Sequence, residues 1–283
     1  MVFFEFIDSY PEFLNITKKL ASADVAGVDI ECENNIYHYG VYLSLVQIAV
    51  KDNTYVVDAI ALKNLEPLKA FFESEKVEKI FHDVSFDFRV IKKHFGIVPK
   101  NIFDTQTAAK LIGESEISLS DLMEKYLGIT KNSTFQRSDW STRPLDNEMI
   151  EYAAKDAHYL LHLREKLIEL LALQKKLAEA KKAFSSLTQK DYILSAPDYR
   201  KIKGAGQLTN NELNNLRLLS IVRDKYAKIA NRPAHFIIPN RMLIAFSKMP
   251  PASILEWQSL RGVHPIVKRN APEFYRALKR INP

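Results

Sequence analysis

The chain has 283 residues and a mass of 32.5 kDa, a length typical of one large or two modest domains. Its 47% hydrophobic and 26% charged residues are ordinary for a globular protein and argue against disorder, while the single cysteine, Cys32, excludes an internal disulfide scaffold and favours a cytoplasmic setting. The net charge of +6 is only mildly basic, and no apolar run reaches the roughly 18 residues that span a bilayer, so we expect a soluble protein that uses no membrane.

Strand patterns dominate the first sixty residues and helical patterns follow. The β-rich segments are residues 27–31, 43–50 and 54–57, with a turn signal between the last two. Amphipathic helical patterns come next at residues 65–74, 86–95 and 105–112, and one long pattern runs from about residue 147 to residue 183. This order predicts an α/β or α+β domain in which helices cover a sheet.

The charge balance changes sign near residue 190. Residues 1–190 hold 24 Lys and Arg against 28 Asp and Glu, a net charge of −4, whereas residues 191–283 hold 16 against 6, a net charge of +10. Such a shift suggests a domain boundary, and turn-forming residues fill the stretch 185–206. We therefore expect a first domain over residues 1–190 with a trailing helix, a linker over 191–206 and a second domain over 207–283.

The second domain is predicted to be a small, all-helical bundle. Its helical patterns lie near residues 210–230, 240–247, 253–260 and 271–280, and prolines separate them.

Asp29 and Glu31 are the first candidate functional residues. They lie two positions apart at the end of an apolar run, and on a strand residues i and i+2 point to the same face. The repulsion between two such carboxylates is relieved by a cation, by a shared proton or by solvent. The motif alone is also compatible with two solvated charges at the end of a strand.

Three further residues fall on predicted helices. Asp87 shares the apolar stripe of its helix with Val90 and Ile91, so an ionised carboxylate there needs a partner, whereas its neighbour Asp83 is better explained as a helix N-cap. Tyr152 and Asp156 are four residues apart and face the same way, which is also the spacing of a hydrogen-bonded core pair. Four carboxylates converging from a strand and two helices would suit Mg²⁺ or Mn²⁺.

Five segments in register resemble the landmarks of ribonuclease D, a 3′→5′ exonuclease of the DEDDy group with an RNase H-like fold. They are residues 29–31 (Asp-Ile-Glu), 82–87 (His-Asp-Val-Ser-Phe-Asp), 103–106, 138–145 and 152–161. The second domain resembles the helical HRDC domain (helicase and RNase D C-terminal) in residues 218–224, 230–233, 236–240 and 250–262. The resemblance implies an α/β RNase H-like domain, with a mixed sheet flanked by helices, followed by an HRDC-like helical bundle that binds nucleic acid.

The same resemblance implies an activity and a catalytic set. Asp29, Glu31 and Asp156 would hold one divalent cation, Mg²⁺ or Mn²⁺, and Asp29 and Asp87 would support a second. Tyr152 would contact the attacking water, and since the pKa of an unperturbed phenol is near 10, we expect it to orient the water rather than to act as a base. The products would be nucleoside 5′-monophosphates released from a free RNA 3′ end, with tRNA precursors or other small RNAs as substrates.

Nucleic-acid contacts are predicted more loosely. Arg137, Trp140 and Arg143 precede the Tyr152 helix, where guanidinium groups can hold phosphates and an indole can stack on a base. The alternative is that Trp140 packs into the core and Arg143 pairs locally. In the basic domain, Arg223, Arg241 and Lys268 are candidates for phosphate contacts.

Two rival functions stay open on the sequence alone. The first is the trimming of DNA 3′ ends, because the sequence gives no view of a contact to the 2′-hydroxyl of RNA. The second is a catalytically idle nucleic-acid-binding protein, although the four acids and the tyrosine are all present. The sequence does not indicate an obligate protein partner.

Overall fold

The computed structural model describes residues 2–51, 53–131, 134–136, 138–194 and 198–279, and the chain divides into two compact units. Unit 1 comprises Met1–Cys32 and Leu43–Leu194, and unit 2 comprises Glu33–Tyr42 and Ser195–Pro283.

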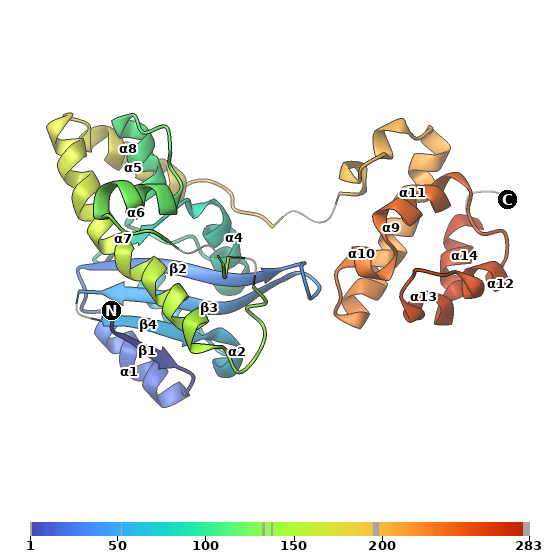
Figure 1. Cartoon of the computed structure of the whole chain (residues 1–283), viewed down its shortest axis with the longest axis horizontal. Helices are drawn as coiled ribbons and strands as arrows, with labels where there is room; N and C mark the ends of the chain where they lie inside the picture. Colours follow the sequence, from blue (N-terminus) through green and yellow to red (C-terminus); the bar gives the residue numbers. More distant parts are fainter. Residues whose placement is uncertain (1, 52, 132–133, 137, 195–197, 280–283) are drawn as a thin grey trace. The chain divides into compact units, whose positions relative to one another are not determined.

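A six-stranded mixed sheet forms the centre of unit 1, with the strand order β1-β4-β3-β2-β5-β6 (Figure 1). The strands are β1 (Phe4–Ile7), β2 (Val25–Asn34), β3 (Val41–Val50), β4 (Asn53–Asp58), β5 (Glu78–Phe81) and β6 (Ile102–Asp104). Strand β3 runs antiparallel to β4, whereas the pairs β1–β4, β2–β5 and β5–β6 are parallel. The three predicted strands are neighbours in this sheet, while β1, β5 and β6 have only four, four and three residues, too few for a clear alternating pattern.

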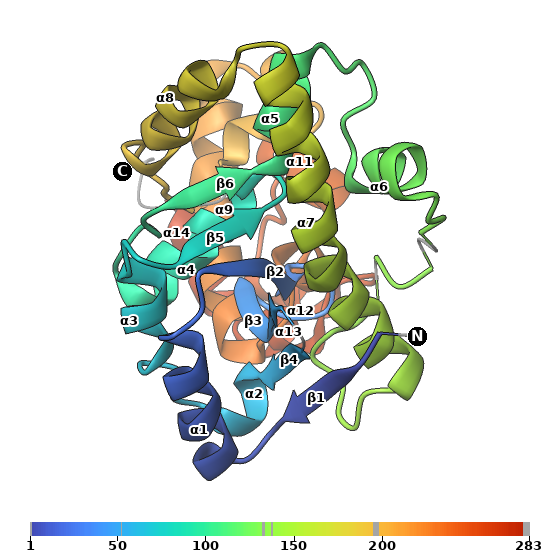
Figure 2. The same cartoon turned by 90° about the vertical axis from the view of Figure 1, so that its left-hand side faces the viewer.

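Helices cover both faces of the sheet. They are α1 (Tyr10–Leu20), α2 (Ala59–Leu62), α3 (Leu68–Glu73), α4 (Val84–Phe95), α5 (Thr105–Ile112), α6 (Leu119–Leu127), α7 (Asn147–Leu173) and α8 (Leu177–Thr188). Helix α7 lies on one face, where it packs against β1, β4 and β5, while α1, α3 and α4 lie on the other (Figure 2). The predicted fold class is confirmed for this unit.

The single long helix predicted over residues 147–183 is wrong, because the chain breaks it into α7 and α8. Lys175 has a left-handed backbone with φ of 57°, which no helix continues through. On either side of it, Gln174 Nε2 donates to Ile112 O at 3.1 Å and Lys176 Nζ donates to Leu111 O at 2.5 Å. These donors satisfy the free carbonyls at the end of α5, a tertiary contact that helical periodicity does not reveal.

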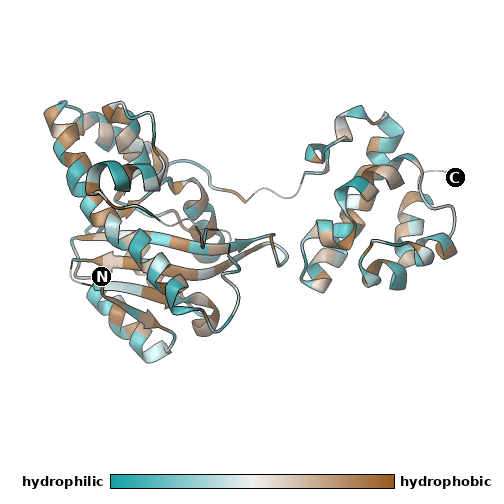
Figure 3. Ribbon diagram, in the orientation of Figure 1, coloured by the Kyte–Doolittle hydropathy of each residue, from teal (hydrophilic) through white to brown (hydrophobic). Residues whose placement is uncertain are grey.

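In unit 2, the described residues from 198 onward form a helical bundle, as the sequence predicts for residues 207–283. Its elements are η1 (Tyr199–Lys201), η2 (Ala205–Gln207), α9 (Asn210–Ala230), α10 (Ala234–Ile237), α11 (Asn240–Lys248), α12 (Ile254–Ser259), α13 (Pro265–Arg269) and α14 (Ala271–Lys279). A reciprocal capping box between Thr209 and Glu212 starts α9. The core holds the stacked rings of Trp257 and Phe274, 5.3 Å apart. The helices of both units carry apolar and hydrophilic residues side by side, as expected for helices with one buried face (Figure 3).

Over the residues that the structure describes, no helix is both long enough and apolar enough to span a membrane.

Candidate active site

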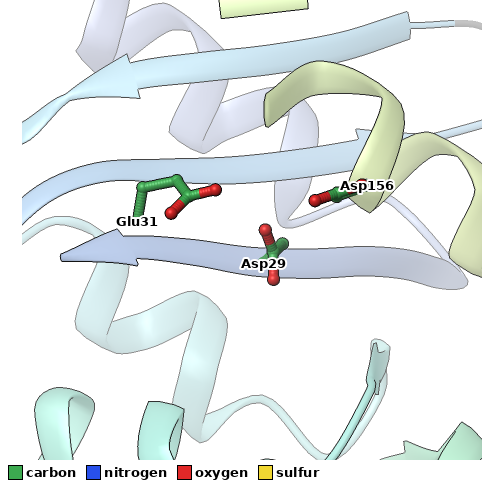
Figure 4. A group of neighbouring side chains, drawn as sticks. All are labelled: Asp29, Glu31 and Asp156. Carbon is green, nitrogen blue, oxygen red and sulfur yellow. The ribbon is translucent and has the colours of Figure 1, made fainter. Parts of the chain in front are cut away.

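Three carboxylates converge between the sheet and α7. Asp29 and Glu31 come from β2 and Asp156 comes from α7, and each offers an oxygen that lies within 4.8 Å of those of the other two (Figure 4). The strand places Asp29 and Glu31 on one face because side chains alternate along it. The sequence predicted this pairing, and the structure adds that α7 closes over the same face.

Helix α7 approaches β2 unusually closely at this point. A Cβ atom on Gly27 would lie 2.2 Å from the carbonyl oxygen of Ala157, a distance that no real contact allows. Ala153, Ala154 and Ala157, on the same helix, are completely buried. Since Gly27 and Asp29 share a strand face and Ala157 follows Asp156, these small residues set the separation between the carboxylates.

Burial raises the pKa of every carboxyl group in the cluster. For Asp29 and Glu31 the main cause is loss of solvent, and Asp29 and Asp156 add repulsion that raises the pKa of Glu31 further. Loss of solvent and the charge of Asp29 raise the pKa of Asp156 to about 7. Without a cation, these buried carboxyl groups therefore favour the neutral form, and a bound cation would hold them in the ionised form.

Asp87 belongs to the same electrostatic site but not to the close group of three. It lies in the first turn of α4, where it is buried. Burial and then repulsion from Asp29 raise its pKa well above the ordinary value. Its neighbour Asp83 caps α4 by accepting a hydrogen bond from Ser85 N at 3.2 Å, so the N-cap prediction is confirmed.

Tyr152 lies one helical turn before Asp156 and is held by aromatic rings. Trp140 stacks on it with ring centroids 6.1 Å apart, and Phe135 meets its edge at 5.8 Å. Burial and the charge of Asp156 raise the pKa of the phenol to about 12. The hydroxyl is therefore protonated at neutral pH and can donate a hydrogen bond, but it cannot serve as a base there.

Lys131 is the functional residue that the sequence reasoning missed. It follows α6 in an irregular segment, and its Nζ lies 2.6 Å from Asp156 Oδ2 and 4.9 Å from the centre of the Tyr152 ring. An isolated lysine in a loop carries no sequence signal that connects it with carboxylates 25 and 100 positions away. Only the tertiary fold brings them together.

The cluster has the chemistry of a divalent-metal site. Carboxylate oxygens are the ligands that Mg²⁺ and Mn²⁺ prefer. Asp156 Oδ1 is buried and has no hydrogen-bond partner among the described residues, and such an oxygen is stabilised by a cation. The donor set therefore fits the predicted metal.

For Trp140 and Arg143 the structure agrees with the alternative interpretation, in which Trp140 packs into the core and Arg143 forms a local ion pair. Trp140 is only 2% exposed, so it presents no ring face to a base from solvent. The Arg143 guanidinium donates to both oxygens of Asp58 at 2.6 and 2.7 Å, and to three backbone carbonyls, those of Trp140, Thr142 and Ser44. With these acceptors in place, Arg143 has no donor left for a phosphate.

Of the other residues predicted to contact nucleic acid, Arg137 lies outside the described residues. Arg223 is buried, and its NH1 group donates to Ile238 O and Asn240 Oδ1, so it braces the bundle and is no surface cation. Arg241 is exposed and Lys268 is partly exposed, as a phosphate contact requires.

Family comparisons agree with this architecture. A family model described as 3′-5′ exonuclease matches residues 4–172, more than half of the chain, and an HRDC domain model matches residues 212–278. The exosome complex exonuclease RRP6 of Saccharomyces cerevisiae is 29% identical over 284 residues, which cover 94% of this chain and 39% of that relative. This chain thus spans well under half the length of that relative.

Two solved structures share the fold. The catalytic core of RRP6 from Trypanosoma brucei matches with a TM-score of 0.88 and 24% identity, covering 99% of this chain and 80% of that one. Escherichia coli RNase D, an exoribonuclease involved in structured RNA processing, matches with a TM-score of 0.79 and 24% identity, covering 99% and 75% of the two chains. By its sequence match and its carboxylate-bearing fold, the chain belongs to the 3′-5′ exonuclease family, in the ribonuclease D-like arrangement that adds an HRDC domain.

Proposed function

We propose that the chain is a divalent-metal-dependent 3′→5′ exoribonuclease that releases nucleoside 5′-monophosphates. The observation that supports this most is the convergence of Asp29, Glu31 and Asp156, whose oxygens lie within 4.8 Å of one another in a chain of the 3′-5′ exonuclease family. Asp29, Glu31 and Asp156 would hold one cation, and Asp29 and Asp87 a second. Mg²⁺ and Mn²⁺ are the proposed ions because the donors are all carboxylates.

Bound divalent ions supply Lewis acidity and stabilise charge on phosphate oxygens. The protein's own contribution lies in the groups around them. Asp29 and Glu31 of β2 and Asp156 of α7 would hold the ions. Tyr152 keeps its proton and donates a hydrogen bond to the attacking water or to the phosphate, and the rings of Trp140 and Phe135 hold it in that orientation.

The proposal is tested by digesting a 5′-labelled RNA with a single-stranded 3′ extension, in EDTA, Mg²⁺ or Mn²⁺. A ladder that shortens one nucleotide at a time from the 3′ end, only with metal, is expected. The variants Asp29→Asn and Asp156→Asn should lower the rate by at least about 1,000-fold, as loss of a metal ligand removes several kcal/mol of transition-state stabilisation. Circular dichroism must show that both variants fold, and full activity in either would overturn the site.

The substrate is proposed to be RNA with a free 3′ end, with tRNA precursors or other small RNAs as candidates. A DNA strand of matched sequence separates this from trimming of DNA ends. Absence of any product from RNA or DNA, together with tight RNA binding, would favour the idle binding protein.

The chain is proposed to act without an obligate protein partner, in the cytoplasm. Since the yeast relative is named as an exosome complex exonuclease, activity of the purified chain alone is the direct test of that independence.

A further inference from the structure

The ammonium group of Lys131 lies inside the carboxylate cluster, as a cation that the protein itself supplies. Its side chain is 16% exposed, and its ammonium sits 2.6 Å from Asp156 Oδ2, on an oxygen of the residue proposed to bind metal. It also lies over the ring of Tyr152 at 4.9 Å. A buried ammonium needs a compensating charge, and here Asp156 and Asp29 supply it.

One ammonium does not neutralise the site. Four carboxyl groups, those of Asp29, Glu31, Asp87 and Asp156, influence one another there, and Asp156 Oδ1 has no hydrogen-bond partner among the described residues. Lys131 thus holds one oxygen of Asp156 and leaves the other open. A divalent cation bound to Asp156 would share this small volume with the ammonium, and like charges at such short range repel strongly in a buried site.

We propose that Lys131 is a tethered placeholder cation: it stabilises the metal-free carboxylate cluster and competes with the divalent cation for Asp156. This inference rests on the metal site proposed above. It has two consequences of opposite sign. Removing the ammonium should lower the stability of the metal-free protein, because the carboxylates lose their counter-charge. It should also raise the affinity for the divalent cation, because the competing charge is gone.

The test uses Lys131→Met in the full chain, since methionine has a similar length and no charge. Binding of Mn²⁺ without RNA is measured by titration calorimetry, and thermal unfolding is measured in EDTA and in Mn²⁺. The variant should bind Mn²⁺ at least 10-fold more tightly than the wild type and unfold at a lower temperature in EDTA. Adding Mn²⁺ should raise its melting temperature by more than that of the wild type.

Lys155→Met is the matched control. Lys155 is adjacent to Asp156 in sequence, but its side chain is 42% exposed and pairs with Glu151 at 2.8 Å. The same loss of charge at this exposed position should change the Mn²⁺ affinity less than twofold. Lys131→Arg, which keeps the charge, should bind Mn²⁺ within threefold of the wild type.

Unchanged or weaker Mn²⁺ binding in Lys131→Met, with normal binding in the wild type, would overturn the inference and leave the proposed function intact. Failure of the wild type to bind Mn²⁺ would instead remove the metal site and the inference with it. If Lys131→Met does not fold, Lys131→Gln gives the same comparison, because its amide can still donate to Asp156 without a charge.

Discussion

The carboxylates of the candidate active site destabilise the fold in the absence of metal. A buried acid whose pKa is raised prefers to be neutral, and at neutral pH each ionised member of the cluster opposes the others. The folded protein therefore keeps a destabilised group of side chains at the place where it needs charge, a pattern common at functional sites.

This strain has a defined pH dependence. The pKa of Asp156 is near 4 in an unfolded chain and is raised to about 7 in the fold, so the folded state binds more protons between these values. The extra protonation of Asp156 in the fold therefore adds to the free energy of unfolding below about pH 4, and this stabilisation is lost as the pH rises through 7. In EDTA the melting temperature of the wild type should fall from pH 5 to pH 8 relative to that of Asp156→Asn, by several degrees, since about 1 kcal/mol corresponds to ~2–4 °C in a protein of this size. A difference between the two proteins that does not vary with pH would contradict this assignment.

Tyr152 gives a second prediction for a single side chain. Tyr152→Phe removes the hydroxyl and keeps the ring between Trp140 and Phe135, so the fold should be unchanged while kcat falls by about 10- to 100-fold, or ~1.4–2.8 kcal/mol. Because the pKa of the phenol is raised to about 12, the wild-type rate should show no step from its ionisation between pH 7 and 9. Single-turnover rates across this range test both points, with Tyr159→Phe on the same helix as the control. A rate that follows the ionisation of Tyr152 near pH 8 would assign it the role of a base instead.

Among elements, the decisive relation is the one between β2 and α7. The strand contributes Asp29 and Glu31 and the helix contributes Asp156, so the width of the proposed metal site depends on how closely the two pack. Gly27 makes that approach possible, since any side chain there meets the backbone of Ala157.

Gly27→Ala should therefore push α7 away from β2. We expect a loss of about 1–3 kcal/mol in the free energy of unfolding, as for other overpacked cores, and weaker Mn²⁺ binding because Asp156 moves with Ala157. Urea unfolding and calorimetric titration measure the two effects. Gly206→Ala is the control, because a Cβ atom there meets nothing within 4 Å. Lower stability with unchanged Mn²⁺ affinity would show that the spacing does not govern the site.

The elements also show where sequence reasoning succeeds. The helices at residues 105–112 and 210–230 begin and end where predicted, because caps and left-handed residues mark their ends in the sequence. The break between α7 and α8 was missed, since side chains bound to α5 cause it. In the site, the spacing of Asp29 and Glu31 and of Tyr152 and Asp156 was readable from strand and helix periods. The position of Lys131, the ion pair of Arg143 with Asp58 and the burial of Arg223 depend on contacts across the fold, which no local pattern encodes.

At the scale of the whole molecule, the net charge conceals two opposite regions. Residues 1–190 carry −4 and residues 191–283 carry +10. The acidic region attracts cations, and the basic helical region attracts the polyanion that the acidic region is proposed to cut.

Binding of RNA should therefore depend on salt through the exposed cations of the helical unit. Arg241→Ala or Lys268→Ala should each weaken binding of a 3′-extended RNA by about 2- to 5-fold at 0.1 M salt and reduce the slope of log K against log salt by up to about one. Fluorescence anisotropy over a range of salt measures both. Lys166→Ala, at an exposed position of α7 where the lysine pairs with Glu169, is the control for a lost surface charge. Equal effects in all three variants would mean that the cations act only through net charge.

The pair formed by Arg143 and Asp58 limits how this protein can change over evolutionary time. Because the guanidinium also donates to three backbone carbonyls, exchanging the two residues would leave a carboxylate facing those oxygens, so the pair has a fixed direction. Lysine is not a simple substitute for Arg143, because the three N–H donors of an ammonium cannot replace the five donors of the planar guanidinium. A change in Arg143 alone would leave the buried carboxylate of Asp58 without this ion-pair partner, and a change in Asp58 alone would take the carboxylate from the Arg143 guanidinium. The segment that presents Trp140 to Tyr152 is thereby tied to the sheet by a contact with few accessible substitutions.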